Sequence, residues 1–542
     1  MKTSRIYRIF KMATAEFCLF FLRLFRKFTS LFTFEETHDG ISVPHAVEAT
    51  KPSVLDIKTE MELDGVPVDR YERSLPVSFS PDEEYSPLEG IVTFRGNHLR
   101  DSGSYGTADI KKKELAVKWS IPTGKLEKTY GKGYWTGSGW TGQPLIVRWS
   151  PEMIKKTDIR TDKERVTEAV YATMDGNVYF IDIENGSFTR DPVSYGLPFK
   201  GAGALDPRGY FSVSGAGDDG PGEDGAARAV FTSLFDRSRL YELGRRDAFA
   251  PRKFHGYDSS VIIDRKTDFL FQPGENGIIY SMKLNTKDEG RSIEPSEILK
   301  FRYTSPRNSE ERYWLGMEDS AAFYKNYMYI ADNGGNLLCI DVNTMELIWA
   351  QDVKDDTNGS PVVRIEDGIP YIYIATSLHW TSSRVLRLAD VPIFKINGLT
   401  GEYVWIRTYF CNTVAGVSGG VQATPAVGKG EIEDLVIFPV ARTPRVRSGL
   451  LVALDSKTGN EVWRLPMRRY AWSSPVAVYD KEGRSYIVAG DSEGTLYLVE
   501  GRTGKLLSTV SLGANIEATP AVFENMIVVG TRGQKIFGIE IQ

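Results

Sequence analysis

A short apolar strand that ends in tryptophan recurs along this chain of 542 residues, and it constrains the fold more than any other feature. The repeated segments are Glu346–Trp349, Glu402–Trp405 and Glu461–Trp463, and each follows a turn that contains Thr together with Gly or Asn. Leu115–Trp119 has the same form but precedes every repeat. A recurring unit of this kind indicates a repeat architecture, in which each unit buries its apolar face against its neighbours.

The clearest unit begins at Trp472 and contains four short apolar strands joined by turns. Asp-Gly, Asn-Gly and Glu-Gly pairs between apolar runs predict hairpins, because Gly and Asn tolerate positive φ angles. The 51 glycines and the aromatic content of 12% also suit many short strands and tight turns. Four antiparallel strands at a period of about 40–60 residues are typical of a propeller blade. The sequence therefore predicts an all-β propeller.

Small residues, often followed by proline, precede the first strand of each unit and allow the blades to be counted. The unit within 200–250 is the weakest, because an acidic, Gly-rich insertion at 215–226 separates its expected strands. We expect eight blades, with seven as the alternative if this segment is only an insertion. The expected blade starts are Gln143-Pro144, Gly203-Ala204, Ser259-Ser260, Ser320-Ala321, Ser360-Pro361, Thr424-Pro425, Ser474-Pro475 and Thr519-Pro520.

The last unit contains only three strands before the chain reaches Gln542. Its missing outer strand is the one that Leu115–Ile121 can supply, which would join the two ends of the repeat array in one blade. Closing the ring in this way removes the free edge that an open array would expose. We therefore predict a propeller closed by an N-terminal strand.

Three parts of the chain are expected. Residues 1–34 combine basic and aromatic side chains and predict a short helical or disordered segment that associates with a membrane; a signal peptide, a signal anchor and an interfacial helix remain open. Residues 35–90 are rich in Pro, Glu, Asp and Ser and are expected to be a linker. Residues 91–542 form the propeller.

Several function classes receive no support from the composition. The net charge of −5 gives no general electrostatic case for binding nucleic acid. The three cysteines, Cys18, Cys339 and Cys411, form no Cys-x-x-Cys pair, and the five histidines are scattered, so neither a zinc site nor a Ser-His-Asp triad is indicated. We expect no catalytic residues and no metal site.

Candidate binding residues lie at the blade starts and among the tryptophans. Carboxylates near the blade starts could gather in the central funnel, and exposed aromatic side chains often mark binding surfaces. Turn capping and ordinary blade packing are the alternatives for both groups. Arg95, Arg100 and Asp101 are expected to form an ion-pair network that fixes the incoming chain. The candidate ligand- or partner-binding residues are Trp140, Gln143, Asp258, Glu318, Asp319, Trp380, Trp472 and Glu517.

The tryptophan strand and its Thr-Gly turn resemble the pyrroloquinoline-quinone-type repeat of quinoprotein dehydrogenases and the propeller lipoprotein of the bacterial outer-membrane barrel-assembly machinery. A closer resemblance is to uncharacterised bacterial quinone-repeat-like proteins, on the segments Phe94–Asn97, Trp140–Pro144 and Pro273–Gly277. For the alcohol dehydrogenases, the resemblance implies two adjacent cysteines beside the quinone, a calcium or lanthanide ion and an aspartate base. This chain has no adjacent cysteines.

We therefore expect a non-catalytic, membrane-associated propeller that acts as a binding or assembly platform on the extracytoplasmic side of the bacterial cell envelope. Its expected partners are proteins or envelope glycans, with the membrane contacted through residues 1–34 and no nucleic acid. A divergent quinone-dependent alcohol or sugar dehydrogenase is the alternative. No cofactor is expected. Pyrroloquinoline quinone and calcium are implied only by the resemblance to the quinoprotein dehydrogenases.

Overall fold

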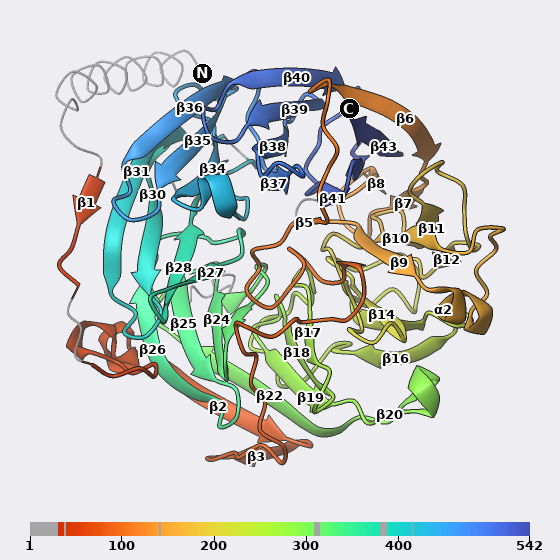
Figure 1. Cartoon of the computed structure of the whole chain (residues 1–542). Helices are drawn as coiled ribbons and strands as arrows, with labels where there is room; N and C mark the ends of the chain where they lie inside the picture. Colours follow the sequence, from red (N-terminus) through yellow and green to blue (C-terminus); the bar gives the residue numbers. More distant parts are fainter. Residues whose placement is uncertain (1–30, 37–39, 140–141, 308–314, 380–386, 415) are drawn as a thin grey trace, which may run out of the picture.

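The computed structural model describes residues 31–36, 40–139, 142–307, 315–379, 387–414 and 416–542. These residues form eight blades of antiparallel strands arranged around one axis (Figure 1), which confirms the prediction of an eight-bladed all-β propeller. The expected membrane-associating helix falls almost entirely within residues 1–30, which lie outside the described residues.

The first four blades follow one another along the chain, and each begins with its innermost strand. Blade 1 contains β9 (Leu145–Trp149), β10 (Val166–Ala172), β11 (Asn177–Asp182) and β12 (Val193–Ser194), with β4 (Gly90–Ile91) on the inner edge; blade 2 contains β13 (Ala204–Leu205), β14 (Phe211–Gly215), β15 (Ala229–Ser233) and β16 (Arg239–Leu243); blade 3 contains β17 (Ile262–Asp264), β18 (Phe269–Pro273), β19 (Ile279–Lys283) and β22 (Ser296–Thr304); blade 4 contains β23 (Ala322–Tyr324), β24 (Tyr327–Ala331), β25 (Asn336–Asp341) and β26 (Glu346–Asp352).

The remaining blades repeat this order, and the last one takes its outer strand from an earlier part of the chain. Blade 5 contains β27 (Val362–Glu366), β28 (Ile369–Ala375), β30 (Leu388–Asn397) and β31 (Tyr403–Asn412); blade 6 contains β33 (Ala426–Val427), β34 (Leu435–Ala441), β35 (Gly449–Asp455) and β36 (Glu461–Met467), with β29 (Ser377–Leu378) and β32 (Gly419–Gly420) attached; blade 7 contains β37 (Val476–Tyr479), β38 (Ser485–Gly490), β39 (Thr495–Glu500) and β40 (Leu506–Ser511); blade 8 contains β41 (Ala521–Phe523), β42 (Met526–Thr531), β43 (Lys535–Ile541) and β6 (Leu115–Pro122).

Short elements decorate the ring. They are the hairpin β7 (Lys125–Glu127) and β8 (Tyr134–Thr136), the hairpin β20 (Thr286–Lys287) and β21 (Ser292–Ile293), the helix α2 (Pro151–Lys156), and the 3-10 turns η1 (Glu48–Thr50), η2 (Pro52–Leu55), η3 (Asp288–Gly290) and η5 (Gly430–Ile432). The serine hydroxyl of Ser150 accepts a hydrogen bond from the backbone N–H of Met153 and caps α2.

Strand position explains the sequence pattern within a blade. Middle strands such as β10 and β34 are buried along their whole length, because neighbouring blades cover both faces, and they are therefore continuously apolar. Outer strands such as β36 alternate between buried and exposed residues. Blade 2, the weakest unit in the sequence, has four paired strands, and this decides the blade count in favour of eight.

The repeated tryptophan and the repeated turn glycine are two halves of one contact between blades. Each indole N–H donates to a carbonyl of the next blade, and each indole ring covers a turn glycine at which a Cβ atom would come within 2.8 Å or less of the ring. These glycines have positive φ angles as well. The tryptophans and their partners are Trp349 with Gly398 and Gly401, Trp405 with Ser456 and Gly459, and Trp463 with Gly501 and Gly504.

The early tryptophan strand closes the ring as predicted. Strand β6 pairs antiparallel with β43 over its whole length, from Leu115 opposite Ile541 to Pro122 opposite Lys535. Trp119 then makes the same contact as the other tryptophans, this time onto blade 1, where its indole N–H donates to the carbonyl of Ile183 at 2.7 Å. Backbone pairing thus completes blade 8, and the side chain of Trp119 joins it to blade 1.

The interpretation of residues 35–90 as a linker is wrong for the greater part of this segment. Strands β2 (Lys58–Leu63) and β3 (Val66–Val68) extend blade 3 beyond β22. Strand β1 (Leu31–Thr33) precedes this segment, at the end of the expected membrane-associating residues 1–34, and extends blade 5 beyond β31. The segment lacks a propeller repeat, but its strands satisfy the backbone groups of exposed blade edges. Composition alone could not reveal this, because edge strands need only one apolar face.

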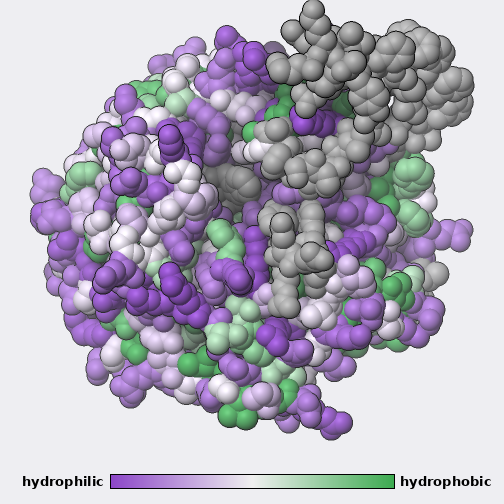
Figure 2. All heavy atoms as spheres, turned by 180° about the vertical axis from the view of Figure 1, so that it is seen from behind, coloured by the Kyte–Doolittle hydropathy of each residue, from purple (hydrophilic) through white to green (hydrophobic). Residues whose placement is uncertain are grey.

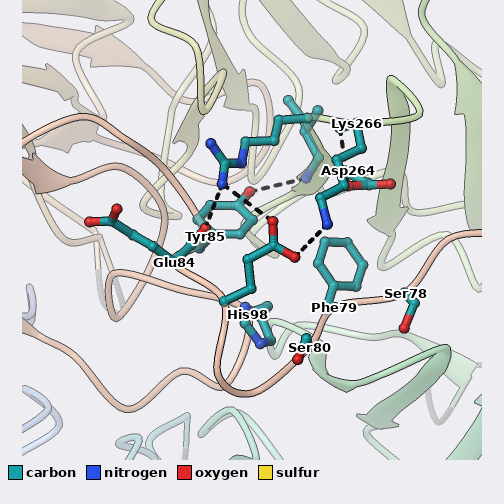
Figure 3. A pocket seen from close by; sticks show the side chains of 11 residues that line it. Ser78, Phe79, Ser80, Glu84, Tyr85, His98, Asp264 and Lys266 are labelled. Atoms are coloured by element: carbon teal, nitrogen blue, oxygen red, sulfur yellow. Dashed lines mark hydrogen bonds and ion pairs between the residues drawn. The ribbon is translucent and has the colours of Figure 1, made fainter.

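Residues 77–85 of the same segment are seated on the ring near blade 3 (Figure 3). The phenyl ring of Phe79 stacks on the imidazole of His98 at 5.5 Å between centroids and packs against Phe323. The hydroxyl of Tyr85 accepts a hydrogen bond from the backbone N–H of Ile263 at 3.1 Å. Burial lowers the pKa of His98 to about 4, so this imidazole is neutral at physiological pH.

Residues 90–105, which we call the hub, run around the axis and contact all eight blades. Figure 1 shows this orange segment crossing the centre of the ring. The hub contacts the blades in three ways. Strand β4 pairs with blade 1, and β5 (Ser104–Tyr105) pairs with blade 8. Backbone carbonyls of Val92, His98 and Leu99 accept hydrogen bonds from blades 2, 4 and 5. Arginine side chains reach blades 3, 6 and 7.

Two buried guanidinium groups make the hub's side-chain contacts. Arg95 donates to the carbonyls of Pro475 and Pro425 at 2.7 and 2.9 Å, and Arg100 donates to those of Ala321 and Ser260 at 2.8 and 2.9 Å. Both side chains are almost completely buried, and burial lowers the pKa of Arg95 to about 10 and that of Arg100 to about 9. The expected ion-pair network is therefore wrong for these arginines, because carbonyl groups hold them.

Candidate functional site

A cavity of about 530 Å³ lies on the ring axis, lined largely by residues that stand just before the innermost strands of several blades. The face opposite to that of Figure 1 has a hollow near its centre (Figure 2), and the hub fills the axis on the other side. Four of the candidate residues line this cavity: Asp258, Glu318, Trp472 and Glu517. The prediction that carboxylates from different blades gather at the funnel thus matches the geometry.

The other four candidates do not line the cavity or lie outside the described residues. Asp319 is buried beside it, where its carboxylate accepts a hydrogen bond from the backbone N–H of Ala331 at 3.1 Å. The amide of Gln143 links the hub to blade 8, since it accepts a hydrogen bond from the backbone N–H of Arg95 and donates one to the carbonyl of Pro520. Trp140 and Trp380 fall outside the described part of the chain.

Three cationic side chains in the cavity each lie near a carboxylate. The ammonium of Lys200 is 3.7 Å from Asp218, Arg252 is 3.9 Å from Glu275, and Arg532 is 3.8 Å from Glu517. Since five carboxylates line the cavity, Asp258 and Glu318 remain without an ion pair among the described residues. The cavity is therefore acidic at its centre.

The environment of Asp258 disfavours its ionised form. It is 5% exposed, and its Oδ1 atom accepts no hydrogen bond from any group that the structure describes. Burial, followed by repulsion from Glu318 and Asp218, raises the pKa of Asp258 to about 7, although Lys200 opposes this. Burial, followed by repulsion from Glu318 and Asp258, also raises the pKa of Glu275. Burial lowers the pKa of Lys200, but the carboxylates of Asp258, Glu275 and Asp218 outweigh it and raise this pKa to about 12.

Glu318 is held by amide groups. Asn333 and Asn358 donate hydrogen bonds to its two carboxylate oxygens at 3.1 and 2.9 Å. Burial and the nearby Asp356 raise the pKa of Glu318. Asp356 in turn lies 3.0 Å from the imidazole of His379, so the acidic cluster extends beyond the cavity wall.

Aromatic side chains form the second part of the cavity wall. The β7–β8 hairpin contributes Tyr130 and Trp135, and Phe254, Tyr470 and Trp472 come from other loops. The hydroxyl of Tyr130 donates to Asp218 at 2.6 Å and ties the hairpin to the acidic part. The two kinds of side chain together can bind a ligand that has both a polar or cationic group and an apolar part.

Sequence analysis missed several of these residues, although weak signals existed. Glu275 lies within the segment Pro273–Gly277 on which the closer resemblance rests, and Trp135 lies in a Gly-rich aromatic loop. Asp218 lies in the acidic insertion at 215–226, which sequence analysis treated as an interruption. Lys200 and Arg252 stand in loops without any pattern, and only the ring closure brings them to the axis.

Asp258→Asn is expected to stabilise the protein at neutral and alkaline pH. Well below pH 4 the Asp258 carboxyl is protonated in both the folded and the unfolded protein, so it does not lower the free energy of unfolding there. As the pH rises, the unfolded protein ionises this carboxyl more readily than the folded protein does. The resulting loss of stability reaches its full size above pH 7. The gain in the variant should be on the order of 2–4 kcal/mol at pH 8.

Thermal melts of both proteins at pH 5 and pH 8 test this expectation. Asp82→Asn, at an exposed position in the N-terminal segment, is the matched control and should leave the melting temperature unchanged. A variant of Asp258 that melts below the native protein at pH 8 would show that the native carboxylate has a stabilising partner there.

Comparison with known proteins identifies the repeat. A family profile described as "Outer membrane protein assembly factor BamB" matches residues 447–542, which include blade 7, the three C-terminal strands of blade 8 and part of blade 6. The propeller is built from pyrroloquinoline-quinone-type repeats. "Outer membrane protein assembly factor BamB" of Kangiella koreensis is 24% identical over 204 residues, which is 36% of this chain and 44% of that protein.

Other similar proteins carry diverse names. "Tetrathionate hydrolase" of Acidithiobacillus ferrooxidans is 25% identical over 228 residues, 40% of this chain and 41% of that protein. The chain thus spans less than half of the length of the curated relatives it matches. Quinohemoprotein alcohol dehydrogenases from Pseudomonas putida HK5 and Comamonas testosteroni align with TM-scores of 0.54 and 0.51 at 10% and 12% identity, each covering 84% of this chain and 80% of the other. At this identity the likeness shows the fold alone.

The described residues do not fit the quinone–calcium site that the resemblance implies. Cys339 and Cys411 are buried within β25 and β31 of different blades, and neither lines the cavity. Among the residues that the structure describes, no group of three or more His, Cys, Asp or Glu side chains is arranged to hold a metal ion.

Proposed function

We propose that this chain is a non-catalytic binding or assembly platform of the bacterial cell envelope, which binds partners at the cavity face of its ring. The observation that carries the proposal is the combination of quinone-type repeats with an axial cavity whose residues do not match a quinone site. The similarity to "Outer membrane protein assembly factor BamB" supports an envelope role and protein partners. Envelope glycans are the other partner class.

The proposal places the propeller on the extracytoplasmic side, associated with a membrane through residues 1–34. The basic and aromatic character of that segment supports this placement. None of the helices within the described ranges is both long enough and apolar enough to cross a membrane. Strand β1 fixes the start of the described chain to the outer edge of blade 5.

A divergent quinone-dependent alcohol or sugar dehydrogenase is the second candidate. Its support is the axial position of the cavity together with the fold shared with two quinohemoprotein dehydrogenases. The absence of adjacent cysteines from the sequence weighs against it.

One preparation of the full-length protein can separate the two candidates. A photoreactive amino acid at Thr129, an exposed residue of the β7–β8 loop next to Tyr130 of the cavity wall, should cross-link a discrete protein in envelope fractions of the native host. The same amino acid at Glu346, at the exposed start of outer strand β26, is the control and should not cross-link that protein. The protein incubated with pyrroloquinoline quinone and calcium should show no dye-linked oxidation of alcohols or sugars. Turnover in that assay would favour the dehydrogenase instead.

A further inference from the structure

We propose that the axial cavity binds an organic cation, in which a primary ammonium group contacts Asp258 and Glu318 and an attached alkyl part packs against the aromatic wall. This goes beyond a platform role and does not depend on it, because it names the chemistry of a small ligand. Polyamines are the simplest class that combines both features.

Charge is the first argument for a cation. Five carboxylates and three cationic side chains line the cavity, and each cationic side chain lies within 3.7–3.9 Å of its own carboxylate. Asp258 and Glu318 have no cation at ion-pair distance in the described part of the chain. Buried carboxylates are costly without a partner, so an incoming ammonium would supply the missing charge.

The hydrogen-bonding state of Asp258 is the second, independent argument. A carboxylate that is 95% buried normally accepts several hydrogen bonds, yet Asp258 Oδ1 accepts none from the described residues. Glu318, which also faces the cavity, already accepts bonds from two asparagines and needs only charge compensation. An ammonium group has three donors and no acceptor, which suits this pair of carboxylates.

The aromatic wall is the third argument. Its rings already contact cationic groups of the protein: the ammonium of Lys200 lies 4.9 Å from the centroid of Trp135, and Arg252 lies 4.9 Å from that of Phe254. Aromatic faces attract cations, and they cover alkyl chains equally well. A cavity of about 530 Å³ is within the usual range for small-molecule sites.

Isothermal titration of the full-length protein with spermidine tests the proposal. We expect one molecule bound per chain at pH 8, and an affinity at least about tenfold lower for Asp258→Asn, because a charge-assisted contact is lost. Glu318→Gln, which keeps the shape of the side chain and removes its charge, should weaken binding as well. It is the alternative test if Asp258→Asn fails to fold. Asp82→Asn should bind like the native protein.

The pH dependence adds a readout that a merely structural change would not move. Binding should be tighter at pH 8 than at pH 5.5 and should release protons, because the ammonium selects the ionised carboxylates while spermidine stays cationic at both values. The charged groups that line the cavity with Asp258 and face it are Lys200, Asp218, Glu275, Glu318 and Arg252.

Three results would overturn the proposal: no spermidine binding at pH 8, binding unaffected by both cavity variants, or binding that strengthens at pH 5.5. Titrations with calcium and with a chitin oligosaccharide distinguish the competing ligand classes. Tight binding of either one without spermidine binding would replace the organic cation with a metal ion or a glycan. None of these outcomes changes the expected result of the envelope cross-linking experiment.

Discussion

Arg95→Met is expected to destabilise the ring strongly. The guanidinium of Arg95 joins blades 6 and 7 through the carbonyls of Pro425 and Pro475, and no water can replace it in a site that is 1% exposed. Each buried carbonyl left without a donor costs about 1–3 kcal/mol, and lost packing adds to this. A total on the order of 3–6 kcal/mol is a large part of the roughly 5–15 kcal/mol that a domain has available.

Chemical denaturation of the purified variants measures this effect. Arg70→Met is the matched control, since Arg70 is exposed in the same N-terminal segment, and it should unfold at the native midpoint. The unfolding midpoint of Arg95→Lys should lie between those of Arg95→Met and the native protein. An ammonium keeps the charge, but it does not reproduce the planar guanidinium that bridges two carbonyls. An Arg95→Met variant as stable as the native protein would show that the hub is not needed to hold the blades.

Removal of residues 1–124 is expected to prevent folding altogether. That deletion removes the hub, which contacts every blade, and it removes β6, which leaves β43 with an unpaired edge. The sequence alone predicts that removal of residues 1–90 is harmless, but β2 and buried Phe79 now indicate a measurable loss. Removal of residues 1–30 should leave the melting temperature close to that of the full chain.

A single substitution isolates ring closure from the rest of this deletion. Trp119→Ala should cost about 3–5 kcal/mol, because it leaves a cavity between blades 8 and 1 and removes the hydrogen bond to Ile183. Trp463→Ala is the matched variant, since it removes the same contact between blades 6 and 7. The two variants are expected to lose similar amounts of unfolding free energy. A harmless Trp119→Ala beside a damaging Trp463→Ala would contradict closure through Trp119.

The fold could be predicted in detail because the repeat is local. Each blade is a set of consecutive hairpins, so turn residues and apolar runs specify it without long-range information. The ring closure was also predictable, since Leu115–Trp119 is an outer strand without its own blade. The contact between Trp405 and Gly459 explains why both residues recur, although sequence analysis recognised them only as separate signals.

The hub and the edge strands could not be predicted, because they depend on contacts between residues far apart in the chain. Arg95 and Arg100 stand in a polar segment that is typical of a solvated loop, yet ring closure surrounds them with blade carbonyls. The cavity was predictable only in part. Asp258 and Glu318 precede innermost strands and could be placed near the axis, whereas Lys200 and Arg252 stand in irregular loops.

The central claim is that one closed ring forms when the two ends of the repeat array meet in blade 8, and a designed disulfide tests it most directly. Ala116 and Glu540 are paired across β6 and β43. Cysteines at these two positions, in a chain whose Cys18 is replaced by serine, should form an intramolecular disulfide under mild oxidation, because paired residues lie within bridging distance. Cysteines at Ala116 and Lys535 are the control, since Lys535 lies opposite Pro122, roughly 20 Å along the strand from Ala116 at about 3.3 Å per residue. Rapid bridging of the first pair and none of the second is the expected result; equal bridging of both pairs, or of neither, would contradict the closed ring.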